Sequence, residues 1–262
     1  MIHTLLFDLA GTTVDCGCMA PVGVFVEVFR RHGVTIDVPT ARGPMGTHKR
    51  EHIRRIVSLP AVAAQWTAAH GAPPTDADID AMYHLAEPLQ IEVLPAHAAP
   101  IPGFVDLLPA LRAAGYRIGA TTGYTVPMVR VLAPLLAAQG WEPEVLVSAG
   151  EVPAGRPAPH MNWVAATVLG APSAQGCVVF GDTPVDMQAA RNAGMWAVGV
   201  ALTGNEVGLP WDALQALSAI ERDEKRAIAR DRLLAAGAHI VIDSVLDLDA
   251  ALGEVRHRHR LG

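Results

Sequence analysis

The sequence contains little lysine, little aromatic residue and no excess of positive charge. Phe, Trp and Tyr make up 5% of its 262 residues, so the hydrophobic core must consist mainly of aliphatic side chains. The formal net charge is −6, and the chain therefore lacks the positive field with which proteins bind phosphate backbones. We expect no nucleic-acid partner.

Cysteine and long hydrophobic runs are also scarce. Cys16, Cys18 and Cys177 are odd in number, and two of them are too close together for a disulfide framework. No apolar run reaches the ~20 residues that cross a bilayer. The opening MIHTLLFD enters an apolar strand directly, without the charged segment of a secretion signal. We therefore expect a cytoplasmic protein with no membrane partner.

Short apolar segments alternate with helical patterns along most of the chain. Helices are predicted between the strands, for example at 104–115, 126–140 and 185–194. This alternation predicts an α/β fold with a doubly wound parallel sheet and a Rossmann-like core. The predicted strands lie at 3–7, 116–123, 144–150, 177–183, 195–202 and 238–243.

One stretch departs from the alternation. Between about 40 and 97 the only clear patterns are helical, at 48–57, 61–71 and 76–93, separated by Pro and Gly. A helical stretch between the first strand and the rest predicts a cap inserted over the carboxyl edge of the sheet. We expect a core of residues 1–16 and 98–262, and an all-helical cap domain of residues 17–97.

Carboxylates stand at the ends of two predicted strands. FDLAGTTVD (7–15) places Asp8 directly after the first strand, where α/β enzymes present a nucleophilic carboxylate. FGDTPVD (180–186) places Asp182 and Asp186 after another apolar strand. Carboxylates that converge at one edge form an oxygen-rich site suited to Mg2+.

Two other segments supply groups that bind a phosphoryl oxygen. TTGYT (121–125) presents the Thr122 hydroxyl and the Gly123 backbone at a strand end. GRPAP (155–159) supplies Arg156, whose planar guanidinium suits phosphate and stays charged. Each motif is weak alone, but the four in this order predict a phosphoryl-transfer site.

The order of these motifs resembles the haloacid dehalogenase-like superfamily, and the residues in and around them resemble one family within it, the phosphonoacetaldehyde hydrolases. The resemblance implies a small phosphonate substrate and a homodimer formed through the caps. It also implies that the Ala10 backbone carbonyl ligates the metal with Asp8 and Asp182, that Asp186 ligates or orients it, and that Cys18 borders the site. The stretches that carry the resemblance are 8–21, 43–54, 121–125, 153–159 and 181–200.

Ala10 distinguishes the chain from most of this superfamily. The usual signature is DxDx[TV], in which the second Asp protonates the leaving oxygen of a phosphate ester. A phosphonate leaves as a carbanion, which needs an electron sink instead of an acid. When an aldehyde lies β to phosphorus, a lysine imine supplies that sink. Loss of the acid at position 10 therefore predicts a catalytic lysine.

The chain has only two lysines to choose from. Lys225 lies in the charge run ERDEKR, which we interpret as solvated surface, whereas Lys49 lies in the predicted cap. His52 is three residues further along the same helix, and Met45 would be one turn earlier if the helix extends that far. Burial and nearby positive charge would lower the amine pKa from its usual ~10.4. We therefore predict that Lys49 forms the imine, with His52 and Met45 in support.

Together with the resemblance, these observations predict the activity of that family, a Mg2+-dependent hydrolysis of phosphonoacetaldehyde. Lys49 would form a Schiff base and Asp8 an aspartyl-phosphate, which releases acetaldehyde and phosphate in 2-aminoethylphosphonate degradation. One alternative is a Mg2+-dependent phosphomonoesterase or phosphomutase of the same superfamily, against which Ala10 counts. Another is a non-catalytic phosphate-binding scaffold, which would have no need of a lone cap lysine. A dehalogenase is disfavoured because it needs no paired acids for a metal.

Overall fold

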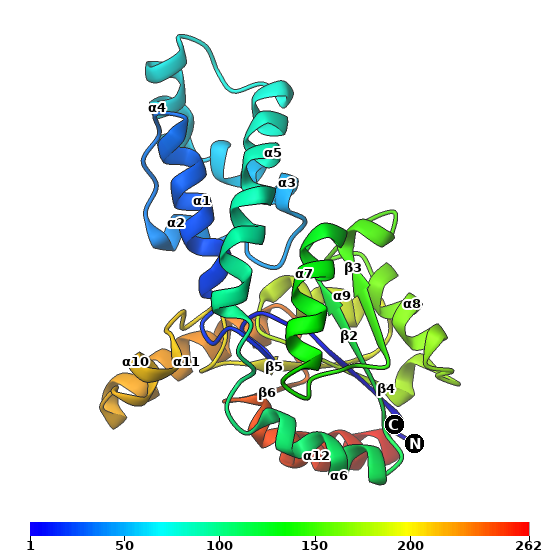
Figure 1. Ribbon diagram of the computed structural model, residues 1–262. Helices are drawn as coiled ribbons and strands as arrows, with labels where there is room; N and C mark the ends of the chain where they lie inside the picture. Colours follow the sequence, from blue (N-terminus) through cyan, green and yellow to red (C-terminus); the bar gives the residue numbers. More distant parts are fainter. Residues whose placement is uncertain (262) are drawn as a thin grey trace.

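The computed structural model describes residues 1–261, and its centre is a six-stranded parallel sheet (Figure 1). The strand order is β3-β2-β1-β4-β5-β6, with β1 between β2 and β4. This order confirms the predicted doubly wound α/β fold. The strands are β1 (Thr4–Phe7), β2 (Arg117–Thr122), β3 (Val145–Ser148), β4 (Cys177–Gly181), β5 (Trp196–Val200) and β6 (Ile240–Ile242).

Helices cover both faces of the sheet. Successive strand residues point to opposite faces, so Leu5 and Phe7 belong to one hydrophobic cluster and Leu6 to the other. The first cluster also contains side chains of α6 (Phe104–Ala113), α7 (Val126–Ala137) and α12 (Leu248–Leu261). The second contains side chains of α8 (His160–Val168), α9 (Pro184–Asn192) and α11 (Ala219–Ala235).

Four aromatic rings pack beneath the carboxyl end of β1. Phe7 stacks on Phe180 with the ring centroids 4.8 Å apart. Phe104 and Trp141 contact Phe7 edge-on at 5.5 and 6.1 Å. Rings in these geometries contribute beyond the area that they bury. The strand end that precedes Asp8 is therefore held firmly in the core.

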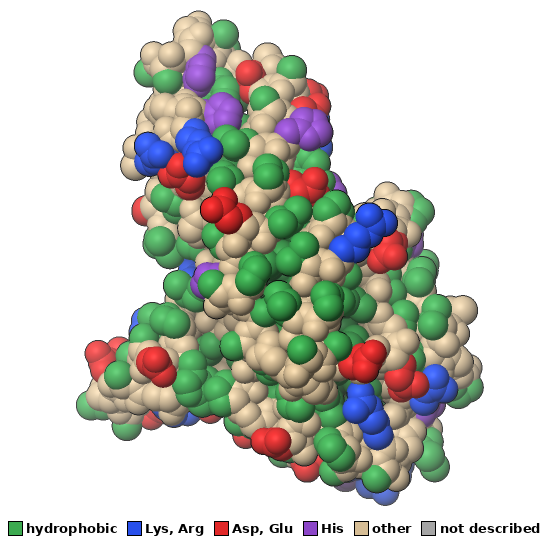
Figure 2. Space-filling view, viewed as in Figure 1, with side chains coloured by type: hydrophobic (Ala, Val, Ile, Leu, Met, Phe, Trp, Pro, Cys, Tyr) green, Lys and Arg blue, Asp and Glu red, His purple; other side chains and the backbone are tan. Residues whose placement is uncertain are grey.

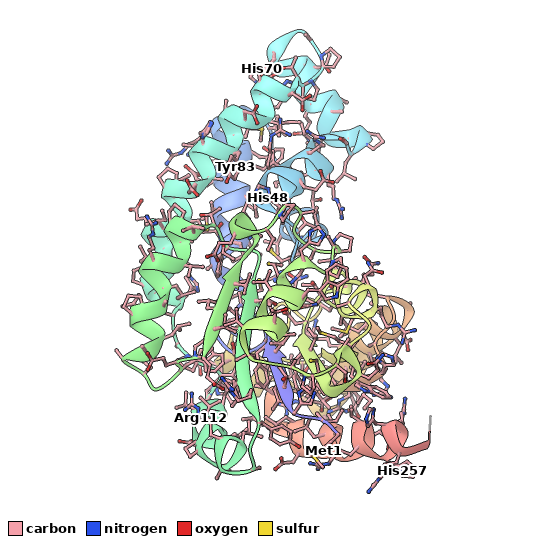
Figure 3. All side chains as sticks on the ribbon, turned by 90° about the vertical axis from the view of Figure 1, so that its right-hand side faces the viewer. Met1, His48, His70, Tyr83, Arg112 and His257 are labelled. Atoms are coloured by element: carbon pink, nitrogen blue, oxygen red, sulfur yellow. The ribbon has the colours of Figure 1, made fainter. Side chains whose placement is uncertain are left out.

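A separate layer of helices lies over the carboxyl edge of the sheet (Figure 1). Its own hydrophobic cluster includes the fully buried Phe25 and Trp66. In Figure 3, His48 and Tyr83 lie close together on the side nearer the sheet, and His70 lies at the far tip. The helices are α1 (Met19–Arg31), α2 (Val38–Arg42), α3 (Lys49–Val57), α4 (Pro60–His70) and α5 (Asp76–Val93). The division at 16/17 and 97/98 stays a prediction.

The two connections between this helical layer and the core run side by side. The backbone N–H of Ile101 donates to the Thr13 carbonyl at 2.8 Å, and that of Asp15 donates to the Ala99 carbonyl at 3.1 Å. The Asp15 carboxylate, which is buried, also lies 3.1 Å from Nδ1 of His97. Hydrogen bonds thus join the outgoing and the returning chain.

Most predicted helices agree with the structure, and the helix predicted at 76–93 matches α5. Three helices were not predicted: α2, α10 (Trp211–Gln215) and α11. The charge run that contains Lys225 lies within α11, whose fully buried side chains are only Ala229 and Leu233. So narrow an apolar stripe gives little helical periodicity to detect. Short 3-10 helices complete the fold: η1 (Leu94–His97), η2 (Ala149–Glu151), η3 (Ala174–Gly176) and η4 (Val245–Asp247).

The surface view in Figure 2 shows how side-chain types are distributed on one face. Hydrophobic side chains gather in the middle, over α5 and α7, and charged side chains lie mostly toward the two ends. Among the described residues, no helix combines the length and the apolar character needed to cross a membrane.

Gly46 provides a test of how tightly the helical layer packs on the core. Its φ is +83°, and a Cβ there would lie 2.4 Å from Thr183 Oγ1. Gly71 has a similar φ of +77°, but a Cβ there would meet nothing within 4 Å. We expect Gly71→Ala to lower the free energy of unfolding by about 1 kcal/mol through backbone strain alone. Gly46→Ala should lower it by about 2 kcal/mol or more, because overlap adds to strain.

Urea unfolding of the two variants measures this difference. Equal losses would mean that the loop around Gly46 does not pack closely against the core in solution.

Candidate active site

Asp8 lies at the carboxyl edge of the sheet, directly after β1, with 6% of its surface exposed. The backbone N–H of Asp8 donates to the Phe180 carbonyl at 2.9 Å, and Thr13 Oγ1 donates to the backbone carbonyl of Asp8 at 2.9 Å. These bonds fix the backbone. The carboxylate accepts a hydrogen bond from Arg156 Nη2 at 2.7 Å.

Arg156 is a buried cation between two carboxylates. Its Nη2 contacts Asp8 Oδ1 and also donates to the carbonyl and hydroxyl oxygens of Thr121, both at 2.9 Å. Its Nη1 lies 2.7 Å from Asp186 Oδ1. Burial opposes the charge, but Asp186 and Asp8 outweigh it and raise the Arg156 pKa. The guanidinium therefore remains charged and holds both acids in place.

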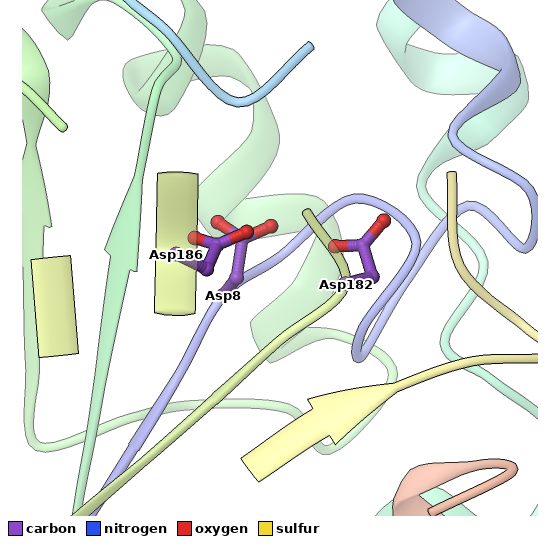
Figure 4. A group of neighbouring side chains, drawn as sticks. All are labelled: Asp8, Asp182 and Asp186. Atoms are coloured by element: carbon purple, nitrogen blue, oxygen red, sulfur yellow. The ribbon is translucent and has the colours of Figure 1, made fainter. Parts of the chain in front are cut away.

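Asp8, Asp182 and Asp186 form an acidic triad (Figure 4). One ligand atom from each lies within 4.8 Å of the others, and all three residues are buried. Arg156 can balance only one of three negative charges. Carboxylate oxygens are the ligands that hard divalent cations prefer, so the triad has the composition of a site for such a cation.

Burial and the charges of neighbouring groups shift the pKa values of two members of the triad. Burial, followed by the charges of Asp8 and Asp186, raises the Asp182 pKa well above its usual value. Burial raises the Asp186 pKa to about 6, although Arg156 opposes the rise. Without further positive charge, these carboxylates are therefore harder to ionise than ordinary aspartates.

Hydrogen bonds from three segments orient these two carboxylates. Thr12 Oγ1 donates to Asp182 Oδ1 at 2.9 Å, and the backbone N–H of Asn205 donates to Asp182 Oδ2 at 2.7 Å. Asp186 Oδ2 accepts from the Thr183 backbone at 3.0 Å and so caps the N-terminus of α9. Asp186 Oδ1 makes no such hydrogen bond and has only the Arg156 ion pair.

The turn after Asp8 brings the backbone close to the triad. Gly11 adopts φ +84°, and a Cβ there would lie 2.2 Å from Asp182 Oδ2. Only glycine fits this position. Ala10 lies beside Asp8 in the pocket lining, with no carboxyl group at the position where the superfamily signature has its second acid.

Lys49 reaches the same pocket from the helical layer. It is the first residue of α3, and 4% of it is exposed. Its Nζ lies 5.6 Å from the ring centroid of Phe25 and 5.3 Å from that of Tyr124. Burial lowers its pKa against the opposing effects of Cys18 and Asp8, and Arg156 adds a smaller lowering. The structure thus provides the direction of shift that an imine-forming amine requires.

The pocket brings together most of the residues predicted from the sequence. Asp182 and Asp186 join it through the triad rather than through its lining. The predicted residues that line it are Asp8, Ala10, Cys18, Met45, Lys49, Thr122, Gly123 and Arg156.

The predicted supporting residues differ in their surroundings. His52 does not line the pocket: its Nε2 lies 2.8 Å from the Ala41 carbonyl, and its ring stacks on Phe25 at 3.8 Å. Met45 lines the pocket from a turn, because α3 begins only at Lys49. Burial raises the Cys18 pKa well above its usual value, so this thiol remains protonated.

Several lining residues were missed by sequence reasoning. Tyr124 lies within the TTGYT motif, but the motif predicted a role only for the Thr122 hydroxyl and the Gly123 backbone. Its buried ring faces Lys49, and its backbone N–H donates to Thr122 Oγ1 at 3.2 Å. Gly46 had no separate signal, since its importance lies in a contact with α9. The missed lining residues are Pro21, Gly46, Tyr124 and Thr183.

The sequence model of a protein family, the haloacid dehalogenase-like hydrolases, matches residues 2–194 of this chain. The chain is 44% identical over 257 residues to a phosphonoacetaldehyde hydrolase of Nitratidesulfovibrio vulgaris, covering 98% of this chain and 92% of that protein. It is 42% identical to a phosphonoacetaldehyde hydrolase of Paraburkholderia phytofirmans, covering 98% and 96%.

Solved structures show the same relationship. A phosphonoacetaldehyde hydrolase-like protein from Oleispira antarctica superposes with a TM-score of 0.97 at 38% identity, covering all of this chain and 95% of that one. A β-phosphoglucomutase from Clostridium difficile superposes with a TM-score of 0.70 at 18% identity, covering 100% of each chain. The latter likeness shows a shared fold only.

The buried position of Arg156 leads to a stability prediction. In metal-free buffer, Arg156→Ala leaves two buried carboxylates without a counter-charge, and we expect the free energy of unfolding to fall by about 3–5 kcal/mol. Arg117 forms an ion pair with Glu144 at 2.6 Å, but 52% of its side chain is exposed. Arg117→Ala should therefore lower the free energy by less than about 1 kcal/mol. Guanidinium unfolding of both variants tests this, and similar losses would contradict the counter-charge role.

Proposed function

The chain belongs to the phosphonoacetaldehyde hydrolase family of haloacid dehalogenase-like hydrolases, and we propose that it hydrolyses phosphonoacetaldehyde through a lysine imine and an aspartyl-phosphate. The products are acetaldehyde and phosphate. The observation that carries the mechanism is a pair of changes in one pocket. Position 10 has no acid, and a buried lysine of lowered pKa lies in the same pocket as Asp8.

The proposed first step forms a carbon–nitrogen bond at Lys49. The neutral amine adds to the aldehyde carbon, and the adduct takes up one proton from solvent and loses water, which gives a protonated imine. Lys49 is buried, with the rings of Phe25 and Tyr124 near Nζ, and this burial favours the neutral amine that attack requires. The imine carbon then lies two bonds from phosphorus, and the imine can accept the electron pair of the carbon–phosphorus bond.

The second step breaks the carbon–phosphorus bond. An oxygen of Asp8 attacks phosphorus, and the electron pair of the broken bond moves into the imine to give an enamine on Lys49. Protonation of the enamine and hydrolysis of the resulting imine release acetaldehyde. Water then hydrolyses the aspartyl-phosphate, which releases phosphate and restores Asp8. No acid at position 10 is needed, because no oxygen leaves.

Several groups suit the negative charge of the transferring phosphoryl group. Arg156 offers guanidinium N–H donors next to Asp8, and the Thr122 hydroxyl and the Gly123 backbone line the same pocket. Asp8, the Ala10 carbonyl, Asp182 and Asp186 would hold Mg2+, with Asp186 either as a ligand or behind one. When bound there, Mg2+ would offset the repulsion between the Asp8 carboxylate and phosphoryl oxygens.

The apolar lining has a supporting role in the proposal. Met45 and Cys18 line the pocket near the amine without adding charge, since the Cys18 thiol remains protonated. His52 would support Phe25 from behind by stacking instead of contacting substrate. Burial and the charge of Lys49 lower the His52 pKa well below its usual value, so a neutral ring is expected there.

The alternatives fit the pocket less well. A phosphomonoesterase or phosphomutase would need an acid for the leaving oxygen, and Ala10 cannot supply one. A phosphate-binding scaffold would have no use for a buried lysine, which raises the free energy of the folded state. The cytoplasmic location and the homodimer formed through the caps stay predictions.

The direct test is phosphate release from phosphonoacetaldehyde. We expect turnover with Mg2+, little turnover after EDTA treatment, and little release from p-nitrophenyl phosphate. Asp8→Asn should remain folded, since the amide oxygen can still accept from Arg156, but it should lose turnover because an amide cannot form the phosphoenzyme. An active, folded Asp8→Asn variant would be incompatible with the proposed nucleophile. Faster hydrolysis of the ester than of the phosphonate would favour the phosphomonoesterase.

Lys49 is tested by trapping the imine. Borohydride added with acetaldehyde should inactivate the enzyme irreversibly and place a reduced two-carbon adduct on Lys49, as mass spectrometry would show. The trapping rate should rise with pH toward the lowered Lys49 pKa, because only the neutral amine attacks. Lys49→Met should fold at least as stably as the wild type, because it removes a buried charge, yet lose C–P cleavage by orders of magnitude.

Lys225→Met is the matched control, since it removes the other lysine, which lies on α11. It should retain both trapping and turnover. An adduct confined to Lys225 would remove the basis for the phosphonate mechanism.

A further inference from the structure

Arg42 joins the helical layer to the core through neutral hydrogen-bond acceptors. It is the last residue of α2, and its side chain is half-buried. Nη1 donates to the Gly17 carbonyl at 2.6 Å, on the connection into the layer. Nη2 donates to the Gly208 carbonyl at 3.0 Å, on the 203–210 loop, which links β5 to α10 in the core. One guanidinium thus bridges three segments.

The same guanidinium is connected to the acidic triad. Arg42 Nη1 also donates to Asn205 Oδ1, at 3.2 Å. The backbone N–H of Asn205 in turn donates to Asp182 Oδ2 at 2.7 Å, and Asn205 is buried. A path of two hydrogen bonds therefore runs from α2 to a carboxylate of the triad.

Close backbone packing holds this path in one position. Gly208 has φ +66°, and a Cβ there would lie 2.6 Å from Arg42 Cζ. Gly17 has φ +79°, and a Cβ there would lie 2.4 Å from the Leu209 carbonyl oxygen. A Cβ on Gly204 would lie 2.5 Å from Asp182 Cβ. The loop is thus packed tightly against Arg42 at one end and Asp182 at the other.

The contact is specific but includes no ion pair. Among residues 1–261, no carboxylate forms an ion pair with Arg42 within 4.0 Å, and its Nε is buried without a hydrogen-bond partner. Hydrogen bonds from an arginine to carbonyl groups are weaker than those to a carboxylate. Such a contact can hold the layer against the core and still be released.

We propose that Arg42 is a positioning residue that couples closure of the helical layer over the core to the geometry of Asp182. When the layer closes, Lys49 enters the pocket, and the same movement seats Arg42 on the 203–210 loop. The loop then presents the Asn205 N–H to Asp182. Opening would loosen that hydrogen bond and weaken the cation site. This inference rests on the proposed function, because it takes the triad as the Mg2+ site.

The test measures Mg2+ binding by calorimetry without substrate. Arg42→Met keeps an unbranched side chain but removes every N–H donor. We expect its Mg2+ dissociation constant to rise about tenfold to a hundredfold, as is typical when a group that orients a metal ligand is lost. Arg42→Lys should give a smaller rise, because an ammonium can reach some but not all of the acceptors. If Arg42→Met does not fold, Arg42→Lys decides.

Two comparisons separate coupling from general damage. Arg232 lies on α11 and contacts the same loop through Glu206 at 3.0 Å. Glu206 accepts from the Asn205 side-chain amide at 3.3 Å, but Arg232→Met removes neither hydrogen bond of the path from Arg42 to Asp182, so it should leave Mg2+ affinity within about twofold of the wild type. In a double-mutant cycle, Arg42→Met and Asn205→Ala should be strongly non-additive, since both interrupt one path.

Wild-type Mg2+ affinity in both Arg42 variants would overturn the inference, and so would additivity or an equal effect of Arg232→Met. A wild type that binds Mg2+ but does not cleave phosphonoacetaldehyde would contradict the proposed function and leave the role of Arg42 open to the same measurement.

Discussion

The buried guanidinium of Arg156 is the contact on which the rest of the site depends. Asp8 and Asp186 come from segments far apart in sequence, and each alone would be expensive to bury as an anion. Arg156 contacts both and is itself held by Thr121 on β2. The guanidinium therefore joins β2 to the segments that follow β1 and β4. It also lowers the cost of burying several carboxylates at one edge of the sheet.

Arg156 neutralises only part of the negative charge of the acidic triad, and this residual charge suits the site to a cation. One cation cannot neutralise three carboxylates. Burial, together with the negative charge of neighbouring acids, raises the pKa values of Asp182 and Asp186, and added positive charge would oppose that rise. Lys49 has the opposite problem, because a cation is disfavoured where its amine lies. The pocket thus favours a charged metal on one side and a neutral amine on the other. Active sites commonly sacrifice stability in this way.

The sequence was sufficient for features that depend on local pattern. Strand ends followed by Asp8 and Asp182 predicted a shared edge, because parallel strands end on the same side. The missing acid at Ala10 and the scarcity of lysine directed attention to Lys49, which lies in the pocket, and its catalytic role stays a prediction. The features that escaped prediction depend on contacts between distant segments. Gly46 matters through Thr183, and nothing around residue 46 indicates that partner.

The sequence pattern was less informative where the surroundings of a side chain or the existence of a helix depend on burial. Helical spacing placed His52 on the face of Lys49, but the His52 ring stacks on Phe25 and does not line the pocket. The charge run of α11 concealed a helix, since two buried side chains were enough to anchor it. A one-dimensional pattern reports which side chains could be buried, whereas the partner that buries them belongs to the tertiary structure.

The paired connections near Thr13 and Ile101 have an evolutionary consequence. Because the chain leaves and re-enters the core at adjoining points, the intervening helices amount to an insertion in one loop, and the sheet needs no rethreading to accept them. A lineage could exchange that insertion while retaining its phosphoryl-transfer residues. In such an exchange Lys49 would be inherited together with the helices, and the proposed imine chemistry would be gained or lost with them.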